Sequence, residues 1–322
     1  MNNYEFKGDN VGKRKSHLVR KLLWALGIVF TCLIIIFLSF YFISKYSKTH
    51  ISSKTLEKYW NSSDENKYEL IFKDGKELLQ SEPFNNAALI YYGYSCFYLA
   101  VSQTDSSEMQ TYLDECINSL RLALYDAKEK TKPQIYYMLG KSYFYKNKIN
   151  ENYYADLTIK YLNEALNLGY KADDIPEYLG MSYAALGMTM ESISAFSEAL
   201  LVRESYNLLV SIAEQYKKNG QYSSSKQYLY RVITESENDE LIEKSRIMLG
   251  NIYLEEENYE DAQKEFEQVL KINENSGDAH YGIGVIYEKQ GNLVKARSEW
   301  RTALKYQVNH QSALYKLSEN KR

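Results

Sequence analysis

The sequence predicts an all-α protein in which a solenoid of stacked helical hairpins follows a single transmembrane helix. Three observations predict this: an uncharged apolar run over residues 22–44, a motif that recurs with a nearly constant period, and only 3 prolines in 322 residues. We expect a basic tail (1–21), a membrane helix (22–44), a polar linker (45–54) and the solenoid (55–322). The net charge of -3 lacks the basic excess of nucleic-acid-binding proteins, so no nucleic acid is expected as a partner.

The apolar run reads LLWALGIVFTCLIIIFLSFYFIS from Leu22 to Ser44. Its length as a helix is about 34 Å, enough to cross the hydrocarbon core of a bilayer. Trp24 and Tyr41 stand near its ends, where aromatic residues favour the membrane interfaces. The run is too long for a cleaved signal peptide and no small-residue cleavage site follows it. Lipidation at Cys32 is also disfavoured because the chain stays apolar beyond it, so we predict a retained single-pass anchor.

Charges on either side of the run predict its orientation. Residues 1–21 carry six Lys/Arg, whereas residues 45–64 carry four. The positive-inside rule keeps the denser cluster in the cytoplasm. We therefore expect an inner (cytoplasmic) membrane protein with a cytoplasmic N-terminus and a periplasmic or otherwise extracytoplasmic solenoid, which is mildly acidic with 33 Lys/Arg against 40 Asp/Glu. A reversed topology, with the solenoid facing the cytoplasm, is the alternative.

A short motif recurs along the solenoid region. An apolar residue, a glycine and, three residues later, a tyrosine occur in YYMLGKSYFY, PEYLGMSYAALG, RIMLGNIYLEEENY and HYGIGVIYEKQG. The glycines are Gly140, Gly180, Gly250 and Gly284. The last two are separated by about 34 residues, and a fixed period in this range is typical of a solenoid.

The second half of each unit has matching offsets from the glycine. Residues at +12, +16 and +19 are Ala296, Trp300 and Ala303 after Gly284; Ala262, Phe266 and Val269 after Gly250; and Ser192, Phe196 and Ala199 after Gly180. A degenerate copy contains Ala213, Tyr216, Ser225, Leu229 and Val232. The spacing is helical, and Gly187, Gly220 and Gly291 interrupt it between the halves. Each unit is therefore predicted to be helix, short turn, helix.

These residue types suit two antiparallel helices that cross closely. Gly284 and Ala296 are small enough to permit the contact, and Tyr287 and Trp300 fill the space above and below it. A single hairpin cannot bury its outer apolar face, so the hairpins are expected to stack.

The Gly/Tyr/Ala/aromatic/Ala sets resemble the tetratricopeptide repeat (TPR) family, most clearly over residues 173–310. Looser copies lie upstream: Gly140, Tyr143, Thr158, Leu162 and Ala165, with a six-residue insertion in the turn, and Gly93, Cys96, Cys116, Leu120 and Ala123, with an eleven-residue insertion. YELIFKDGKELLQSEP has the pattern of the second helix of a shortened first unit, and QSALYKLSENKR that of one more first helix. The resemblance implies a right-handed solenoid of about seven repeats with a C-terminal capping helix. Pro83, Pro133 and Pro176 fall at predicted helix edges.

No catalytic or metal-binding pattern is legible. Gly140-Lys141-Ser142 spells the end of a phosphate-binding loop, but that loop needs a glycine where Ile135 stands and a preceding strand. The four histidines, His17, His50, His280 and His310, have no second ligand at a metal-binding spacing. We expect no enzyme activity, no cofactor, no metal and no small-molecule substrate.

Cys96 and Cys116 occupy helix-contact positions of one repeat. A disulfide is conceivable in an exported domain. The favoured interpretation is two buried free thiols that fill small packing sites, because cysteine buries readily.

In the TPR family the first helices line the surface that binds the partner. The resemblance implies partner-binding candidates at Tyr94, Phe97, Tyr98, Tyr137, Lys141, Phe144 and Tyr145, with Lys141 free to face the groove. Aromatic residues are favoured binding anchors. The alternative is that some of them belong to the core between repeats. The Lys/Asn/Arg clamp of chaperone-binding members is not expected, because only Asn251 matches it and Ile247 stands where a lysine is needed.

The predicted function is that of a membrane-anchored, extracytoplasmic scaffold or adaptor that binds protein partners through the groove and the membrane through residues 22–44, with self-assembly possible. In its architecture the chain resembles the TPR proteins that build collars around periplasmic flagellar motors. The alternative function is an envelope chaperone or quality-control factor that binds exported clients near the secretion machinery.

Overall fold

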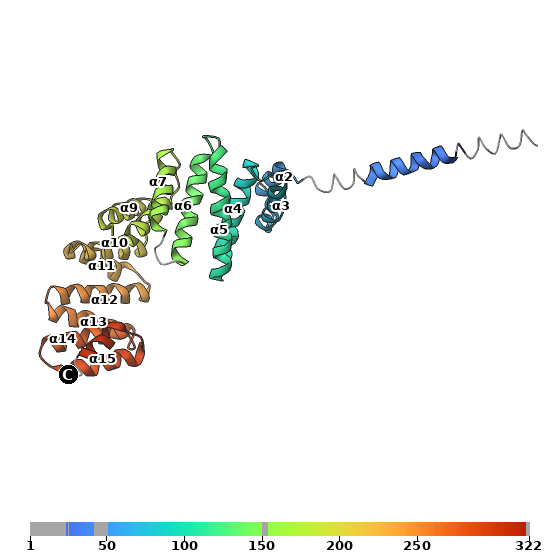
Figure 1. Cartoon of the computed structure of the whole chain (residues 1–322). Coiled ribbons are helices and arrows are strands. Elements are labelled where there is room, and N and C mark those ends of the chain that lie inside the picture. Colours follow the sequence, from blue (N-terminus) through green and yellow to red (C-terminus); the bar gives the residue numbers. More distant parts are fainter. Residues whose placement is uncertain (1–23, 25, 42–50, 150–153, 320–322) are drawn as a thin grey trace, which may run out of the picture.

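A computed structural model of the chain describes residues 24, 26–41, 51–149 and 154–319. Its helices from residue 53 onward pair as consecutive antiparallel hairpins (Figure 1). The pairs are α2 (Ser53–Trp60) with α3 (Lys67–Ser81), α4 (Asn86–Ser102) with α5 (Ser106–Ala123), α6 (Lys132–Ile149) with α7 (Ala155–Asn167), α8 (Ile175–Ala185) with α9 (Thr189–Val202), α10 (Tyr206–Lys218) with α11 (Tyr222–Glu235), α12 (Asp239–Glu255) with α13 (Tyr259–Ile272), and α14 (Gly277–Lys289) with α15 (Leu293–Tyr306). A 3-10 turn, η1 (Leu124–Asp126), follows α5, and α16 (Gln311–Glu319) packs on α15. The predicted seven hairpins and terminal helix are confirmed.

The hairpins stack so that first helices meet first helices. Direct packing joins α2 to α4, α4 to α6, α6 to α8, α10 to α12, and α12 to α14. At every boundary the second helix also packs on the first helix of the next hairpin, and between the fourth and fifth hairpins the junction is formed mainly by this contact of α9 with α10. Figure 1 shows the array turning along its length, with α4 to α6 running across the direction of α12 and α13.

Glycines of the first helices make room for large side chains of the second helices. A methyl group built on Gly284 would lie 2.4 Å from Trp300, and one built on Gly180 would lie 2.5 Å from Phe196. Both aromatic rings are almost fully buried. The predicted role of the glycines is confirmed, because each accommodates one large side chain of its own hairpin: an aromatic ring at Gly180, Gly250 and Gly284, and a leucine at Gly93 and Gly140.

Polar side chains begin several helices and so satisfy backbone N–H groups that lack a partner within the helix. Asp105 accepts from the N–H groups of Ser107 and Glu108 at the start of α5. Asparagine does the same at Asn85 (α4), Asn238 (α12), Asn258 (α13) and Asn292 (α15).

The turns inside four hairpins share one left-handed backbone position. Gly187, Gly220 and Gly291 have φ of 72°, 71° and 78°, as the sequence suggested for chain-breaking glycines. At the equivalent place between α12 and α13 the residue is Glu257, with φ of 57°. A residue with a Cβ atom is strained there, whereas glycine is not.

Replacing Glu257 with glycine is therefore expected to stabilise the sixth hairpin by about 1 kcal/mol. The stabilisation should appear as slower hydrogen exchange of the backbone amides of α12 and α13, measured in the full chain. The matched control is Gly291→Ala, which places a Cβ in the same conformation and should destabilise its hairpin by a similar amount. Faster exchange in Glu257→Gly would contradict the assignment of strain.

The insertions in the second and third units lengthen helices. The six-residue insertion was expected in the turn around residues 147–156; α6 continues to Ile149, and residues 150–153 lie outside the described ranges. In the second unit α4 and α5 are 17 and 18 residues long, against 11 and 14 for α8 and α9. The first unit also has a first helix, α2, which was not predicted.

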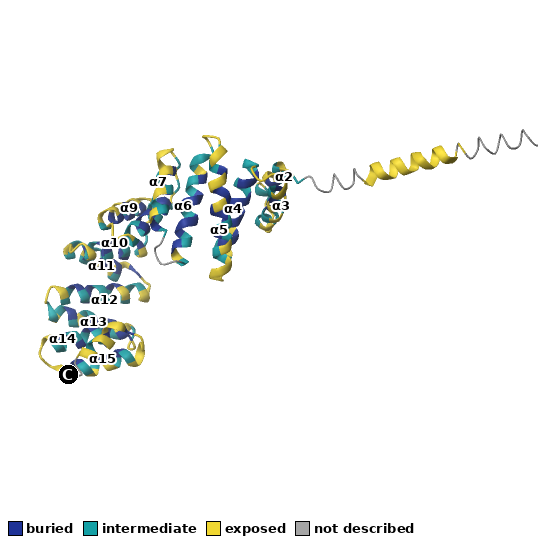
Figure 2. Cartoon of the chain, viewed as in Figure 1, coloured by how far each residue is buried: buried dark blue, intermediate teal, exposed yellow. Residues whose placement is uncertain are grey.

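Residues 26–41 are helical and their side chains are exposed (Figure 2). The predicted span 22–44 includes residues outside the described ranges at both ends. Within the ranges given above, no helix meets the length and apolarity needed to cross a bilayer.

Cys96 and Cys116 are both free and fully buried. The Sγ atom of Cys116 lies 3.1 Å from the Ser142 hydroxyl, so it links the second hairpin to the third. Burial raises the pKa of Cys116 to about 12, and it also raises the pKa of Cys96. Both thiols stay protonated at neutral pH, which agrees with the interpretation of free packing residues.

Iodoacetamide at pH 8 is accordingly expected to leave Cys96 and Cys116 unmodified in the native protein, because the thiolate is the reactive form. Both should be alkylated without reductant after denaturation. Peptide mass mapping reports each site separately, and a pair that stays unmodified until a reductant is added would reveal a disulfide.

Candidate functional site

The first helices of the N-terminal hairpins present a continuous aromatic surface, which we call the first-helix face and define by α2, α4, α6 and α8. Trp60 of α2 lies 5.6 Å from Tyr94 and 6.0 Å from Tyr98, measured between ring centroids. Further centroid contacts join Phe97 to Tyr145 at 5.7 Å and Phe144 to Tyr178 at 4.6 Å. These contacts run across four consecutive hairpins.

The predicted partner-binding residues differ in exposure. Tyr94, Phe97 and Phe144 are buried, with 4%, 3% and 5% of their surface exposed. Tyr98 is exposed at 36%, and Tyr137, Lys141 and Tyr145 are partly buried. The structure brings all seven together on one face, but the buried three pack between repeats and leave the others at the surface.

Several aromatic residues on or beside this face were not singled out from the sequence. Trp60 and Tyr68 come from the first hairpin, and Tyr68 stacks on Tyr98 at 4.5 Å. Tyr170 lies 4.8 Å from Tyr137, and Tyr178 extends the surface onto α8. The spacing of Leu56 and Trp60 after Ser52 was a usable signal for α2, whereas Tyr170 lies in a connection with no periodic pattern.

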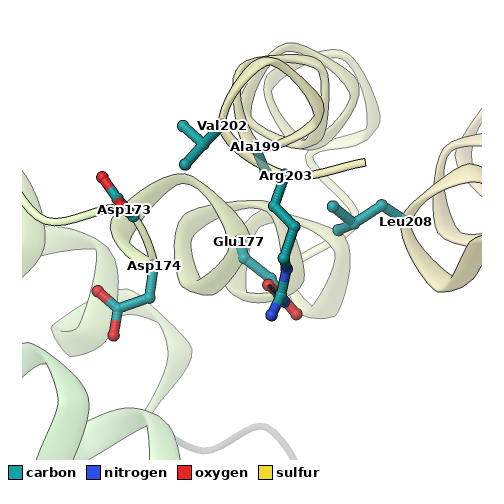
Figure 3. Close-up of a pocket in the computed structure, with 7 residues that line it drawn as sticks. All are labelled: Asp173, Asp174, Glu177, Ala199, Val202, Arg203 and Leu208. Atoms are coloured by element: carbon teal, nitrogen blue, oxygen red, sulfur yellow. Dashed lines mark hydrogen bonds and ion pairs between the residues drawn. The ribbon is translucent and has the colours of Figure 1, made fainter. Parts of the chain in front are cut away.

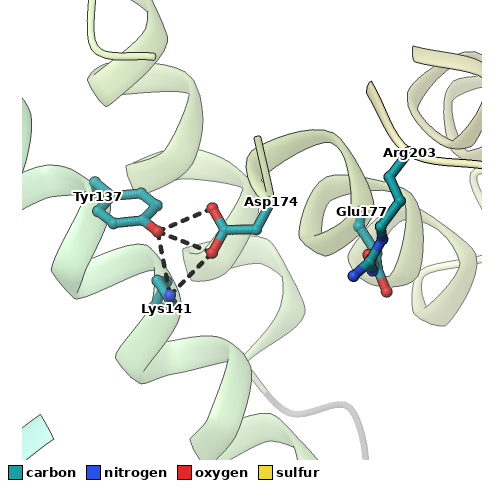
Figure 4. A network of polar contacts seen from close by, with 5 residues as sticks. All are labelled: Tyr137, Lys141, Asp174, Glu177 and Arg203. Carbon is teal, nitrogen blue, oxygen red and sulfur yellow. Dashed lines mark hydrogen bonds and ion pairs between the residues drawn. The ribbon is translucent and has the colours of Figure 1, made fainter. Parts of the chain in front are cut away.

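A polar cluster crosses from the third hairpin to the fourth (Figure 4). The Tyr137 hydroxyl lies 2.8 Å from both carboxylate oxygens of Asp174, and Lys141 Nζ lies 2.9 Å from Asp174 Oδ2 and 3.1 Å from the Tyr137 hydroxyl. Lys141 Nζ also lies 5.6 Å from the Phe97 ring centroid and 5.4 Å from that of Tyr178. The expectation that Lys141 is free to face the groove is wrong, because Asp174 neutralises it.

Burial, and then the hydrogen bond to Asp174, raise the pKa of Tyr137 far above its ordinary value. Tyr137 therefore stays protonated, and its hydroxyl donates a hydrogen bond to the Asp174 carboxylate. Asp174 stands at the start of α8 but does not cap that helix with its side chain. Its carboxylate is directed to α6 and ties the two hairpins together.

Beside this cluster a cavity of about 370 Å³ opens where the fourth hairpin meets the fifth (Figure 3). Asp173, Asp174 and Glu177 supply acidic groups, and Glu177 accepts a hydrogen bond from Arg203 at 3.2 Å. Within the chain, Asp174 is paired with Lys141 and Glu177 is paired with Arg203.

A larger cavity of about 610 Å³ lies between α2, α4 and the connection from η1 to α6. We call it the α2–α4 hollow. Trp60, Ile90, Tyr91 and Tyr94 supply its apolar wall, and Trp60 and Tyr94 also contact the aromatic surface described above. The hollow is therefore continuous with the first-helix face.

The described residues contain no group of three or more His, Cys, Asp and Glu side chains placed to hold a metal ion. His280 Nδ1 lies 2.8 Å from Glu299, and His310 Nε2 lies 3.2 Å from Asp278. The Gly140-Lys141-Ser142 tripeptide lies inside α6, where the Ser142 hydroxyl donates to the Met138 carbonyl at 2.7 Å. Its backbone does not form a phosphate-binding loop.

Comparison with known proteins agrees with this architecture. The family model described as Tetratricopeptide repeat protein 21 C-terminal ARM domain matches residues 188–321. No curated protein matches the chain.

Solved structures share the fold at low sequence identity. The C-terminal part of a TPR repeat-containing protein from Cytophaga hutchinsonii is 12% identical, and the alignment covers 82% of this chain and 98% of that one, with a TM-score of 0.57. The apo form of the quorum sensor NprR from B. thuringiensis is 18% identical over 81% of this chain and 78% of its own, also with a TM-score of 0.57. YrrB, described as a TPR protein with an unusual peptide-binding site, is 23% identical over 63% and 99%, with a TM-score of 0.45.

Proposed function

We propose that this tetratricopeptide-repeat protein is a membrane-anchored scaffold whose first-helix face binds an extended segment of a partner protein. The observation that carries the proposal is the aromatic surface from Trp60 to Tyr178, which continues into the α2–α4 hollow. Tyrosine and tryptophan are favoured anchors because each offers a large rigid surface with a polar end. Stacked hairpins present such a surface over many residues.

The anchor is the second part of the proposal. Residues 26–41 form an apolar helix with exposed side chains, and more Lys/Arg residues precede the predicted span 22–44 than follow it. Anchoring confines the solenoid to the membrane surface and raises its effective concentration toward a partner in the same membrane. We place the solenoid on the extracytoplasmic side, following the positive-inside rule.

Site-specific photo-cross-linking in living cells tests the binding surface. A photoreactive phenylalanine analogue at Tyr98 or Tyr145 is expected to capture a defined partner. The control position is Val294, a second-helix residue that is 82% exposed, where no partner should be captured. Equal capture from all three positions, or from none, would remove the first-helix face as the binding surface.

Topology has its own test. Protease added to intact spheroplasts is expected to digest residues 45–322, because the solenoid is placed outside the cytoplasmic membrane. Full protection of the solenoid would overturn that orientation.

The finer form of the proposal is a fixed structural assembly, such as a collar around a flagellar motor. A fixed component should be recovered with the same partners in constant ratio at different expression levels. Weak recovery of many different clients, with suppressed aggregation of a model substrate, would favour the chaperone function instead.

A further inference from the structure

The α2–α4 hollow has the size and the lining of a ligand pocket. Its volume of about 610 Å³ falls within the range of roughly 300–1,000 Å³ that is usual for such pockets. Trp60, Ile90 and Tyr91 give it apolar walls from two different hairpins. These apolar walls suit a large apolar side chain, and polar and charged residues complete the lining.

One polar group of a buried residue lacks a partner in this hollow. Tyr94 lines it and is only 4% exposed as a residue, and within the described part of the chain its hydroxyl makes no hydrogen bond and is not among the fully buried polar atoms. The neighbouring tyrosine Tyr92 bonds to Glu115, and Tyr137 bonds to Asp174. The Tyr94 hydroxyl is therefore open at the hollow and available to a polar group of a bound molecule.

Charges on the rim are distributed unevenly. On the side of the η1–α6 connection stand Lys128, Lys130 and Asp126, and across the hollow stands Glu57 on α2. Among the described residues neither Lys128 nor Lys130 has an ion-pair partner, although the nearby Lys132 pairs with Glu129 at 2.5 Å. The connection therefore presents a net positive charge beside an apolar wall.

We propose that the α2–α4 hollow binds one large apolar side chain of the partner segment, with the segment's backbone bonded to the Tyr94 hydroxyl and an adjacent Asp or Glu paired with Lys128 and Lys130. This inference rests on the proposed function, and it names the chemistry of the segment. The aromatic surface continues past the hollow to Tyr98 and Tyr145. In this proposal the anchor residue lies within the segment and not at a free C-terminus.

Arrays of blocked peptides test the sequence preference, with the full-length protein in detergent as the probe. Acetylated and amidated 12-residue peptides would carry Phe-Asp, Phe-Lys or Ala-Asp at their centre. Phe-Asp is expected to bind at least about tenfold more tightly than either of the others. Unblocked peptides that end in Phe form a further arm, and a preference for them would overturn the internal anchor. Equal binding of the three central pairs, or no binding, would overturn the pocket.

Reversing the charge of Lys128 and Lys130 tests whether these lysines pair with the acidic residue of the segment. Lys128→Glu together with Lys130→Glu is expected to reverse the preference from Phe-Asp to Phe-Lys, which a merely destabilised protein would not do. The matched control is Lys271→Glu with Lys289→Glu, the same charge change at two exposed lysines of α13 and α14, which should leave the preference unchanged. Tyr94→Phe should weaken Phe-Asp and Phe-Lys alike.

The cross-linking experiment distinguishes a hollow that does not bind the segment from a first-helix face that binds no partner. If cross-linking from Tyr98 still captures a partner in the Lys128→Glu, Lys130→Glu variant at the wild-type level, the first-helix face binds and the pocket does not contribute. If cross-linking captures nothing in either protein, the proposed function itself is wrong.

Discussion

Replacing Phe266 with alanine is expected to destabilise the C-terminal part of the solenoid by about 3–5 kcal/mol. The Phe266 ring is fully buried. A methyl group built on Gly250 would lie 2.8 Å from this ring, and one built on Gly282 would lie 2.4 Å from it. The ring therefore occupies space at both α12 of its own hairpin and α14 of the next. Its loss leaves a cavity within one repeat and at the boundary between two repeats.

Because a solenoid is stabilised by contacts between neighbours, the effect should be local. Hydrogen exchange of the full chain in detergent is expected to show faster exchange in α12 to α15 and little change in α4 to α6. The matched control is Phe84→Ala, since Phe84 is 78% exposed and its truncation should change stability by no more than about 0.5 kcal/mol. Similar effects of the two substitutions, or a uniform effect along the chain, would contradict the placement of Phe266.

The second large effect is expected at the cluster that joins the third hairpin to the fourth. Asp174→Ala removes the acceptor of both Tyr137 and Lys141. The Lys141 side chain is only 17% exposed, so water replaces the lost carboxylate poorly. The Tyr137 hydroxyl loses its acceptor and the Lys141 ammonium keeps only that hydroxyl as a partner, which together are expected to cost about 1–3 kcal/mol. The contact between α6 and α8 should loosen.

A double-mutant cycle separates this interaction from other consequences of each substitution. Asp174→Ala combined with Lys141→Met is expected to cost less than the sum of the two single changes, because the second change removes the charge left unpaired. The control is Glu260→Ala, whose exposed pair with Lys264 should contribute at most about 1 kcal/mol. Additive costs at Lys141 and Asp174 would show that the two side chains do not act together.

The binding face was partly predictable from the sequence. Tyr98 and Tyr145 could be placed on it because each follows a repeat glycine at a constant offset within a first helix. Phe97 and Phe144 stand one residue before these tyrosines and are buried, a difference that the sequence pattern alone did not indicate. Asp174 lies 33 residues after Lys141, and no local pattern announces that their side chains meet.

The sequence by itself determined the repeating unit. The spacing of glycine, aromatic and alanine residues determines where the two helices of a repeat form and where they cross. Each repeat contains this information within its own residues. The left-handed turns at Gly187, Gly220 and Gly291 are equally local.

Only the tertiary structure decided which side chains those units leave open. Neutralisation of Lys141, the unpartnered Tyr94 hydroxyl and the α2–α4 hollow all arise where one hairpin meets the next. The physical reason is that the angle between neighbouring hairpins depends on many packing contacts between residues that are far apart in the sequence. A side chain at a constant position in the repeat can therefore be buried in one copy and exposed in another.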